Sequence, residues 1–152
     1  MKAPRPVRHR RDQYPRILTM TTRLRDNDPY GHMNNAVYSE YFDTAVNQTL
    51  IEAGVLDLER SEVIGLVVQS FAHYFEPVTC PGHVAIGVRV ADIGRSSVSY
   101  EFAMFRDGAE LAAAQGGFIH VYVNRQTQRP VDIPDPLRAV LTDLAVLPAF
   151  QP

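Results

Sequence analysis

The sequence predicts a single α+β domain in which a five-stranded antiparallel sheet wraps around one long helix. Residues 34–54 have a helical period, and five shorter segments alternate apolar with polar side chains as strands do. The order is one strand, then the helix, then four strands with short connections. Since a helix and a sheet must each bury an apolar side, the helix is expected to cover one face of the sheet.

The strands are predicted over residues 16–24, 63–75, 84–92, 97–105 and 109–123. Gly94-Arg95-Ser96 and Asp107-Gly108 separate the last three strands and are short enough to form hairpins. Near the end of the chain, Pro134 and Pro136 precede an apolar stretch, which predicts a short helix at the edge of the sheet.

The long helix has a clear apolar side. At 100° per residue, one half of the helical wheel carries apolar and aromatic side chains, and the other half carries polar ones. The apolar half consists of Val37, Tyr38, Tyr41, Phe42, Ala45, Val46 and Ala53. Gly54 stands where a glycine commonly ends a helix, which predicts the helix boundary.

Length and composition indicate an ordinary globular protein. The chain has 152 residues, 45% of them hydrophobic, which suits one domain. Cys80 is the only cysteine, so no internal disulfide can form, and a cytoplasmic location is expected. No apolar run approaches the length of a membrane span, so no membrane association is expected.

The chain divides into three segments. Residues 1–15 are expected to form a flexible basic arm, residues 16–146 the domain, and residues 147–152 a C-terminal tail. Six basic residues and one acidic residue fall within residues 1–16, whereas the whole chain carries a net charge of -2. A basic arm can contact phosphates, but no aromatic residues are interleaved with basic ones as in nucleic-acid platforms. No nucleic-acid partner is therefore expected.

The segment before the long helix carries the residues best suited to chemistry. Asp28 and His32 lie four residues apart in a turn that leads directly into the helix. The first backbone N–H groups of a helix lack internal partners and lie at the positive end of its dipole. A carbonyl oxygen bound there is polarised, and a nearby carboxylate can attack the carbonyl carbon or activate water. These groups suffice for acyl transfer to water.

Structural roles explain some of these residues equally well. Asp, Asn and Pro before a helix are common capping and turn residues, and Asp26 is expected to be a turn residue. His73 and His120 lie in predicted strands, where packed or solvent-facing histidines are usual, and His83 lies in a loop. No pair of histidines has the spacing of a metal site, so no metal is expected.

Residues 26–38 have the pattern D-x-D-P-x-G-H-x-N-N-x-x-Y, which resembles the signature of the 4-hydroxybenzoyl-CoA thioesterase-like branch of the hotdog superfamily. The resemblance continues through residues 74–78 at the end of the second strand, the 93–97 hairpin, and the last strand with its proline-rich exit at 129–134. It covers roughly residues 16–142 in the family's order. It implies the hotdog fold, and it implies an acyl-CoA thioesterase that hydrolyses a thioester to a carboxylic acid and coenzyme A.

The resemblance also implies roles for residues of this motif. Asp28 matches the catalytic carboxylate, either as nucleophile or as general base, and the backbone N–H near Asn35 matches the donor that polarises the thioester carbonyl. His32 matches a histidine that many but not all members have, and the type enzyme lacks it. Asn34 either caps the helix or orients His32, and Tyr38 belongs to the core or lines the acyl pocket.

A second set of residues is expected to contact the carrier part of the substrate. Arg95, Ser96 and Ser97 can bind the phosphates or pantetheine of coenzyme A, or they form a solvated turn. No cofactor is needed, because coenzyme A enters as part of the substrate. The resemblance further implies a homodimer or a dimer of dimers, with sheets joined edge to edge and each active site drawing on two chains.

Two other functions are compatible with the fold. One is a hotdog enoyl-CoA hydratase or dehydratase, whose G-D-x-N-P-x-H pattern differs here because Tyr30 and Gly31 separate Pro29 from His32. The other is a non-catalytic module that binds acyl-CoA or an acyl-carrier protein. The sequence does not distinguish coenzyme A from a carrier protein, nor does it identify the acyl group.

Overall fold

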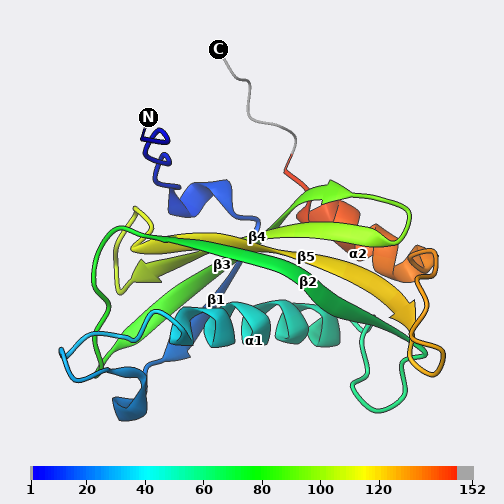
Figure 1. Ribbon diagram of the computed structural model, residues 1–152, viewed down its shortest axis with the longest axis horizontal. Helices are drawn as coiled ribbons and strands as arrows, with labels where there is room; N and C mark the ends of the chain where they lie inside the picture. The colour runs from blue at the N-terminus through cyan, green and yellow to red at the C-terminus, as the bar shows by residue number, and fades with distance from the viewer. Residues whose placement is uncertain (1, 147–152) are drawn as a thin grey trace.

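A computed structural model describes residues 2–146 of the chain, so the predicted tail at 147–152 lies outside the described residues. Five strands form one antiparallel sheet in the order β1-β3-β4-β5-β2, with α1 across one face (Figure 1). The strands are β1 (Arg16–Thr21), β2 (Val63–Tyr74), β3 (His83–Ile93), β4 (Ser97–Arg106) and β5 (Ala114–Asn124). This confirms the predicted α+β fold, a five-stranded antiparallel sheet around one long helix.

Helix α1 (Val37–Glu52) is shorter than its periodic pattern because the residues from Asn34 to Ala36 form its capping turn. Its buried side chains are Tyr38, Tyr41, Phe42, Ala45, Val46, Thr49 and Leu50. Gly54 follows the helix with φ +75°, a conformation that glycine adopts without strain, and so ends it where predicted.

The main core lies between α1 and the face of the sheet that it covers. Alternate residues of the central strands point toward the helix, as the period of two requires. The ring of Phe42 in α1 stacks on that of Phe102 in β4, with centroids 5.3 Å apart. Both rings are almost completely buried, and they hold the helix across the middle of the sheet.

The N-terminal segment lies on the opposite face of the sheet from α1 (Figure 1). Tyr14 is 5% exposed and packs with Ala85, Ala103, Phe105 and Ala112 in a second, smaller core. Residues before it contact the strand region directly, because the backbone N–H of Ala112 donates to His9 O at 2.9 Å. Val7 to Tyr14, part of the segment expected to be flexible, therefore lie along the sheet.

Helix α2 (Asp135–Leu144) packs beside the end of β3 that β1 does not cover. Leu137, Leu141 and Leu144 are its buried residues, and Ala145 pairs with Val90 just after the helix. Pro136 stands in its first turn, where a missing N–H does no harm. This confirms the short helix predicted at the edge. Among residues 2–146, no helix has both the length and the apolarity needed to cross a membrane.

The two edges of the sheet differ. β1 has 6 residues, whereas β2 has 12 and pairs on one side only, with β5. Large apolar side chains of β2 are exposed. They are Leu66, Val67, Val68, Phe71 and Tyr74, with exposed fractions from 38% to 60%. A long strand edge with exposed apolar side chains is a surface that proteins usually pair or cover.

Candidate functional site

The loop between β1 and α1 folds back on itself and presents Asp28 and His32. The backbone N–H of Asp28 donates to His32 O at 2.8 Å, and Gly31 N–H donates to Asp28 O at 3.0 Å. Gly31 has φ +82°, which a residue with a side chain adopts only with strain. Both hydrogen bonds close a tight turn, so the two residues that the sequence singled out lie at the two ends of one turn.

The Asp28 carboxylate is half-buried and only partly occupied. Its Oδ1 accepts the backbone N–H of Tyr30 at 2.9 Å, the contact of an ordinary Asx turn. Within residues 2–146, no group bonds to Oδ2. One oxygen therefore fixes the carboxylate, and the other is available to a water molecule or a carbonyl carbon.

The start of α1 lies at the end of this loop. Asn34 caps it, because its Oδ1 accepts Ala36 N–H at 2.9 Å and its backbone oxygen accepts Val37 N–H at 2.9 Å. In the described part of the chain, the Asn35 N–H has no acceptor. The Tyr74 hydroxyl donates to Asn35 O at 3.0 Å and ties this turn to β2. The exposed Asn35 N–H lies at the positive end of the helix and can bind an oxyanion.

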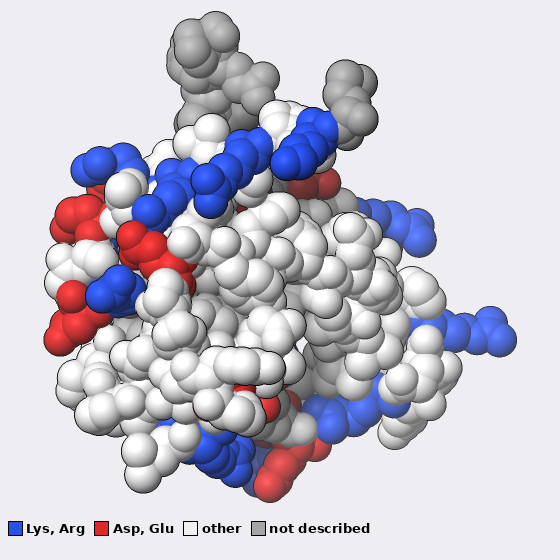
Figure 2. Space-filling model, turned by 60° about the vertical axis from the view of Figure 1, so that its left-hand side comes forward, with Lys and Arg blue, Asp and Glu red and all other residues white. Residues whose placement is uncertain are grey.

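The end of the molecule where α1 begins comes forward in Figure 2. Charged side chains lie mainly along the margins of that face, and its centre is uncharged (Figure 2). An apolar acyl group can approach such a surface without displacing water from ionic groups.

Asp26 holds the loop against the helix. Its side chain is 1% exposed and accepts hydrogen bonds from the Arg23 backbone at 2.8 Å, from Arg23 Nε at 2.9 Å and from the Tyr41 hydroxyl. Its own backbone oxygen accepts Asn34 N–H at 2.8 Å. Burial alone would raise the pKa of Asp26, but the hydrogen bonds from Tyr41 and Arg23 outweigh burial and lower it. Asp26 is thus a positioning residue for the capping turn.

This network predicts a stability loss in acid. Because the folded-state pKa of Asp26 is lowered, its ionised form stabilises the fold above the unfolded pKa of about 3.9. That contribution is lost as the pH falls through the folded-state pKa. The free energies of unfolding of the native chain and of Asp26→Asn, measured in urea, should therefore differ clearly at pH 7. The two values should become equal at the acid end of the pH range. A constant difference across this range would contradict the assigned role.

The other predicted site residues lie elsewhere. Tyr38 is 4% exposed and packs edge to face with Tyr74 at 5.0 Å between ring centroids, within the core beside the loop. Arg95, Ser96 and Ser97 form the hairpin at the far end of β3, where Arg95 pairs with Asp132 at 3.1 Å. At about 3.4 Å per residue, the length of β3 puts this hairpin roughly 34 Å from the loop end of the strand. Within one chain the two groups do not meet.

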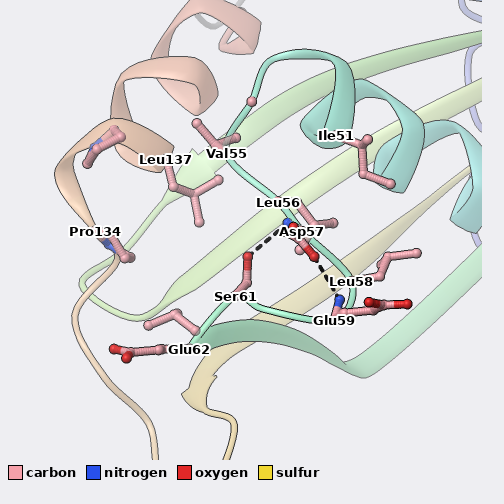
Figure 3. A pocket seen from close by; sticks show the side chains of 13 residues that line it. Ile51, Val55, Leu56, Asp57, Leu58, Glu59, Ser61, Glu62, Pro134 and Leu137 are labelled. Carbon is pink, nitrogen blue, oxygen red and sulfur yellow. Dashed lines mark hydrogen bonds between the residues drawn. The ribbon is translucent and has the colours of Figure 1, made fainter.

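A cavity of about 860 Å³ lies at the other end of α1. Figure 3 shows it between the end of α1, residues 54–62 and the start of α2. Its polar groups bond mainly to each other: Asp57 N–H donates to Ser61 Oγ at 2.8 Å, and Asp57 Oδ1 accepts Glu59 N–H at 2.9 Å. It is open and lined by acidic and apolar residues.

Two buried groups were not assigned a role from the sequence. His120, for which the sequence predicts a packed or solvent-facing histidine, is 6% exposed, and its Nε2 has no partner within the described residues. It lines a cavity of about 250 Å³ between α1 and the strands β2 and β5. The sequence predicts Asp26 as a turn residue and does not predict its contact with Tyr41. The helical wheel contains a sign of this contact, because it places Tyr41 on the same apolar side of the helix as Tyr38. Within residues 2–146, no three potential ligands gather as a metal site would require.

The thioesterase-like superfamily matches the chain over residues 22–141. A search of the curated proteins found no match. Among solved structures, the PA5185 protein from Pseudomonas aeruginosa strain PAO1 has 50% identity and a TM-score of 0.89, covering 91% of this chain and 97% of its own. A thioesterase from Thermus thermophilus, complexed with coenzyme A and Zn, has 29% identity and a TM-score of 0.73, covering 88% and 96%.

A more distant structure has the same fold. Slr0204 from Synechocystis, a 1,4-dihydroxy-2-naphthoyl-CoA thioesterase, shares 16% identity with a TM-score of 0.75, covering 84% of this chain and 96% of its own. At that identity the likeness shows the shared fold alone. The PA5185 protein, in contrast, is similar in sequence as well as in fold over nearly the whole of both chains.

Proposed function

Because the chain belongs to the thioesterase-like superfamily, we propose that it hydrolyses an acyl-CoA thioester to a carboxylic acid and coenzyme A. One observation carries the proposal: the segment that leads into α1 supplies both a partly occupied carboxylate, Asp28, and the Asn35 N–H, which has no acceptor within residues 2–146. The coenzyme A bound to the Thermus thermophilus thioesterase supports this carrier.

The geometry favours the following roles. The thioester oxygen accepts the Asn35 N–H, and negative charge that develops on it is stabilised at the positive end of α1. Asp28 either takes a proton from water as water adds to the carbonyl carbon, or attacks that carbon itself. The C–S bond then breaks, and the thiolate of coenzyme A leaves and takes up a proton. Where Asp28 itself attacks, water then hydrolyses the anhydride formed on Asp28, which releases the carboxylic acid and restores the carboxylate. His32, exposed at the other end of the turn, assists by hydrogen bonding or by orienting water.

A screen of short, long and aromatic acyl-CoAs tests the proposal directly, with release of free thiol as the readout. Hydrolysis of at least one class, lost in Asp28→Asn, supports it. A parallel assay for hydration of enoyl-CoA tests the alternative reaction on this fold. If acyl-CoA binds but no member of either panel reacts, the chain is a binding module instead.

We further propose that the active form is at least a homodimer joined through β2. This edge is long, carries exposed apolar side chains and lies beside the helix entrance, because Tyr74 at its end contacts Asn35. Closed two-fold pairing would cover the edge on both chains. A second chain would also give the thioester a second wall at the entrance of α1. Binding of coenzyme A by Arg95, Ser96 and Ser97 stays a prediction. It requires a second subunit, because within one chain this hairpin lies far from the loop that carries Asp28.

Val68→Lys tests this assembly. Val68 is 60% exposed on β2, and a lysine there is a side chain with which natural edge strands prevent pairing. We expect light scattering to show a shift from the oligomer toward the 17.0 kDa monomer, together with reduced hydrolysis. Leu24→Lys, at a residue that is 81% exposed outside the sheet, is the matched control and should change neither property. A native chain that is monomeric while fully active would contradict the two-chain site.

A further inference from the structure

The cavity beside His120 has the properties of a ligand site. It lies between α1 and β2, with Asp43 and Asn47 on the helix and Gly65 on the strand, and has a volume of about 250 Å³. At about 30 Å³ for each water-sized group, this space holds roughly eight non-hydrogen atoms. A small acyl group fits; coenzyme A does not.

The cavity lies within reach of the helix entrance. Asn35, Ser39, Asp43 and Asn47 are spaced by four, so they lie on one side of the turn and helix. Of these, Asn35, Ser39 and Asp43 are exposed, and Asn47 is partly buried. At 1.5 Å per residue, Asp43 is about 9 Å beyond the first helical residue. An acyl group whose carbonyl sits at the entrance can therefore extend along this side of α1 toward the cavity.

The inner wall of the cavity presents neutral hydrogen-bonding groups. Burial lowers the pKa of His120 to about 4, and burial is also the main cause that raises the pKa of Tyr122 to about 12, so both are uncharged at neutral pH. The Tyr122 and Tyr100 hydroxyls lie 2.7 Å apart. When the Tyr100 hydroxyl donates to the Tyr122 oxygen, the proton of Tyr122, which lines the cavity, is free to be donated to a ligand.

His120 is open toward the strand that borders the cavity. A Cβ on residue 65 would lie 2.9 Å from His120 Nδ1, so the glycine leaves that nitrogen uncovered. Nε2 has no partner within the described residues, and a buried polar atom without a partner destabilises the fold. The His120 ring packs edge to face with Tyr100, with centroids 4.9 Å apart, so packing fixes its orientation. Nδ1, which faces Gly65, is the nitrogen placed to bind a ligand.

Charges around the cavity exclude an acidic ligand. Arg125 is the basic residue in its lining, and its guanidinium already donates to Ser61 O at 2.7 Å and to Leu58 O at 2.9 Å. Asp43 would repel a second carboxylate. A neutral oxygen, in contrast, can bond to both the imidazole and the phenol.

We propose that this cavity binds the acyl part of the substrate, and that His120 and Tyr122 select acyl groups with a hydroxyl or keto oxygen far from the thioester. The proposal rests on the proposed thioesterase function and specifies its substrate class. The imidazole bonds to the ligand oxygen through Nδ1, and the spare Tyr122 proton completes the contact.

The test compares kcat/KM for pairs of unsubstituted and terminally hydroxylated acyl-CoAs of matched length, from butanoyl to decanoyl. The native chain should prefer the hydroxylated member by about 10-fold or more at one length, because the unsubstituted member leaves buried polar groups without partners. In His120→Phe the ratio should fall to near one, and Tyr122→Phe should lower it partially. His120→Gln, which keeps a hydrogen-bonding group, should retain part of the preference and covers the case in which the phenylalanine variant does not fold.

His83→Gln is the matched control, because His83 is an exposed histidine at the start of β3, and its ratio should equal that of the native chain. Hydrolysis with no preference for the hydroxylated acyl-CoA would overturn the proposal that His120 and Tyr122 select the acyl group. A preference that persists in His120→Phe would overturn it as well. If no acyl-CoA is hydrolysed, the proposed function fails, and binding is then tested alone. In that case, the imidazole NMR signal of His120 should still shift on saturation with the neutral ester methyl 8-hydroxyoctanoate but not with methyl octanoate, and no shift would overturn the cavity assignment.

Discussion

Asp28→Asn is expected to lower kcat for thioester hydrolysis by about 100-fold or more without unfolding the protein. The loss is the usual scale for removing a positioned acid–base group or nucleophile. The fold should survive because asparagine keeps the oxygen that accepts Tyr30 N–H, so the turn from Asp28 to His32 can still close. Initial rates on the best substrate of the screen, with circular dichroism on the same sample, give both measurements.

Asp92→Asn is the matched control, since Asp92 is an exposed carboxylate of β3 and its loss should leave turnover unchanged. His32→Ala should lower turnover less than Asp28→Asn does. If the histidine variant loses more, the two roles must be exchanged. A folded Asp28→Asn variant with nearly native turnover would rule out the carboxylate mechanism altogether.

Tyr14→Ala is expected to lower the free energy of unfolding by about 3–5 kcal/mol, the range for removing a buried aromatic side chain. Tyr14 lies directly over Gly87 of β3, where a Cβ would come within 2.5 Å of the tyrosine ring. Its ring meets that of Phe105 edge to face at 5.9 Å, and the Arg89 guanidinium lies 4.8 Å from its centroid. The alanine variant leaves a cavity at each of these contacts.

Tyr14→Phe separates packing from hydrogen bonding. Only the hydroxyl contact with His9 Nδ1, 2.7 Å long, is lost, so this variant should cost about 1 kcal/mol. Guanidinium unfolding monitored by circular dichroism measures both variants. A loss below about 1 kcal/mol in Tyr14→Ala would show that Val7 to Tyr14 are not held on the sheet in solution. Deletion of residues 1–14 should then also leave the stability unchanged.

Local patterns were enough to predict the elements of the fold. The alternation of the strands and the period of the helix are properties of neighbouring residues, and the structure places five strands and α1 close to the predicted ranges. Boundaries differ where caps intervene: α1 begins at Val37 because Asn34 caps the preceding turn, and β1 ends at Thr21 before a short 3-10 turn. The positions of Asp28 and His32 before the helix also follow from the sequence alone.

Contacts between distant residues could not be predicted in this way. Tyr14 follows a basic segment without apolar periodicity, and only the groove over Gly87, formed by another strand, shows why it is buried. Asp26 resembled any turn residue until the fold brought Tyr41 of α1 to its carboxylate.

His120 illustrates the same limit most clearly. A histidine in a strand has no local mark that tells a packed ring from a binding group. The role of the His120 side chain depends on which face of β5 points toward the helix, on the absence of a side chain at Gly65 and on the Tyr100–Tyr122 pair. The order of the elements and the motif at the helix entrance follow from the amino-acid sequence, because neighbouring residues encode both. Which polar groups are buried, and which of these lack partners within residues 2–146, depends on the fold, because burial brings together segments far apart in the chain.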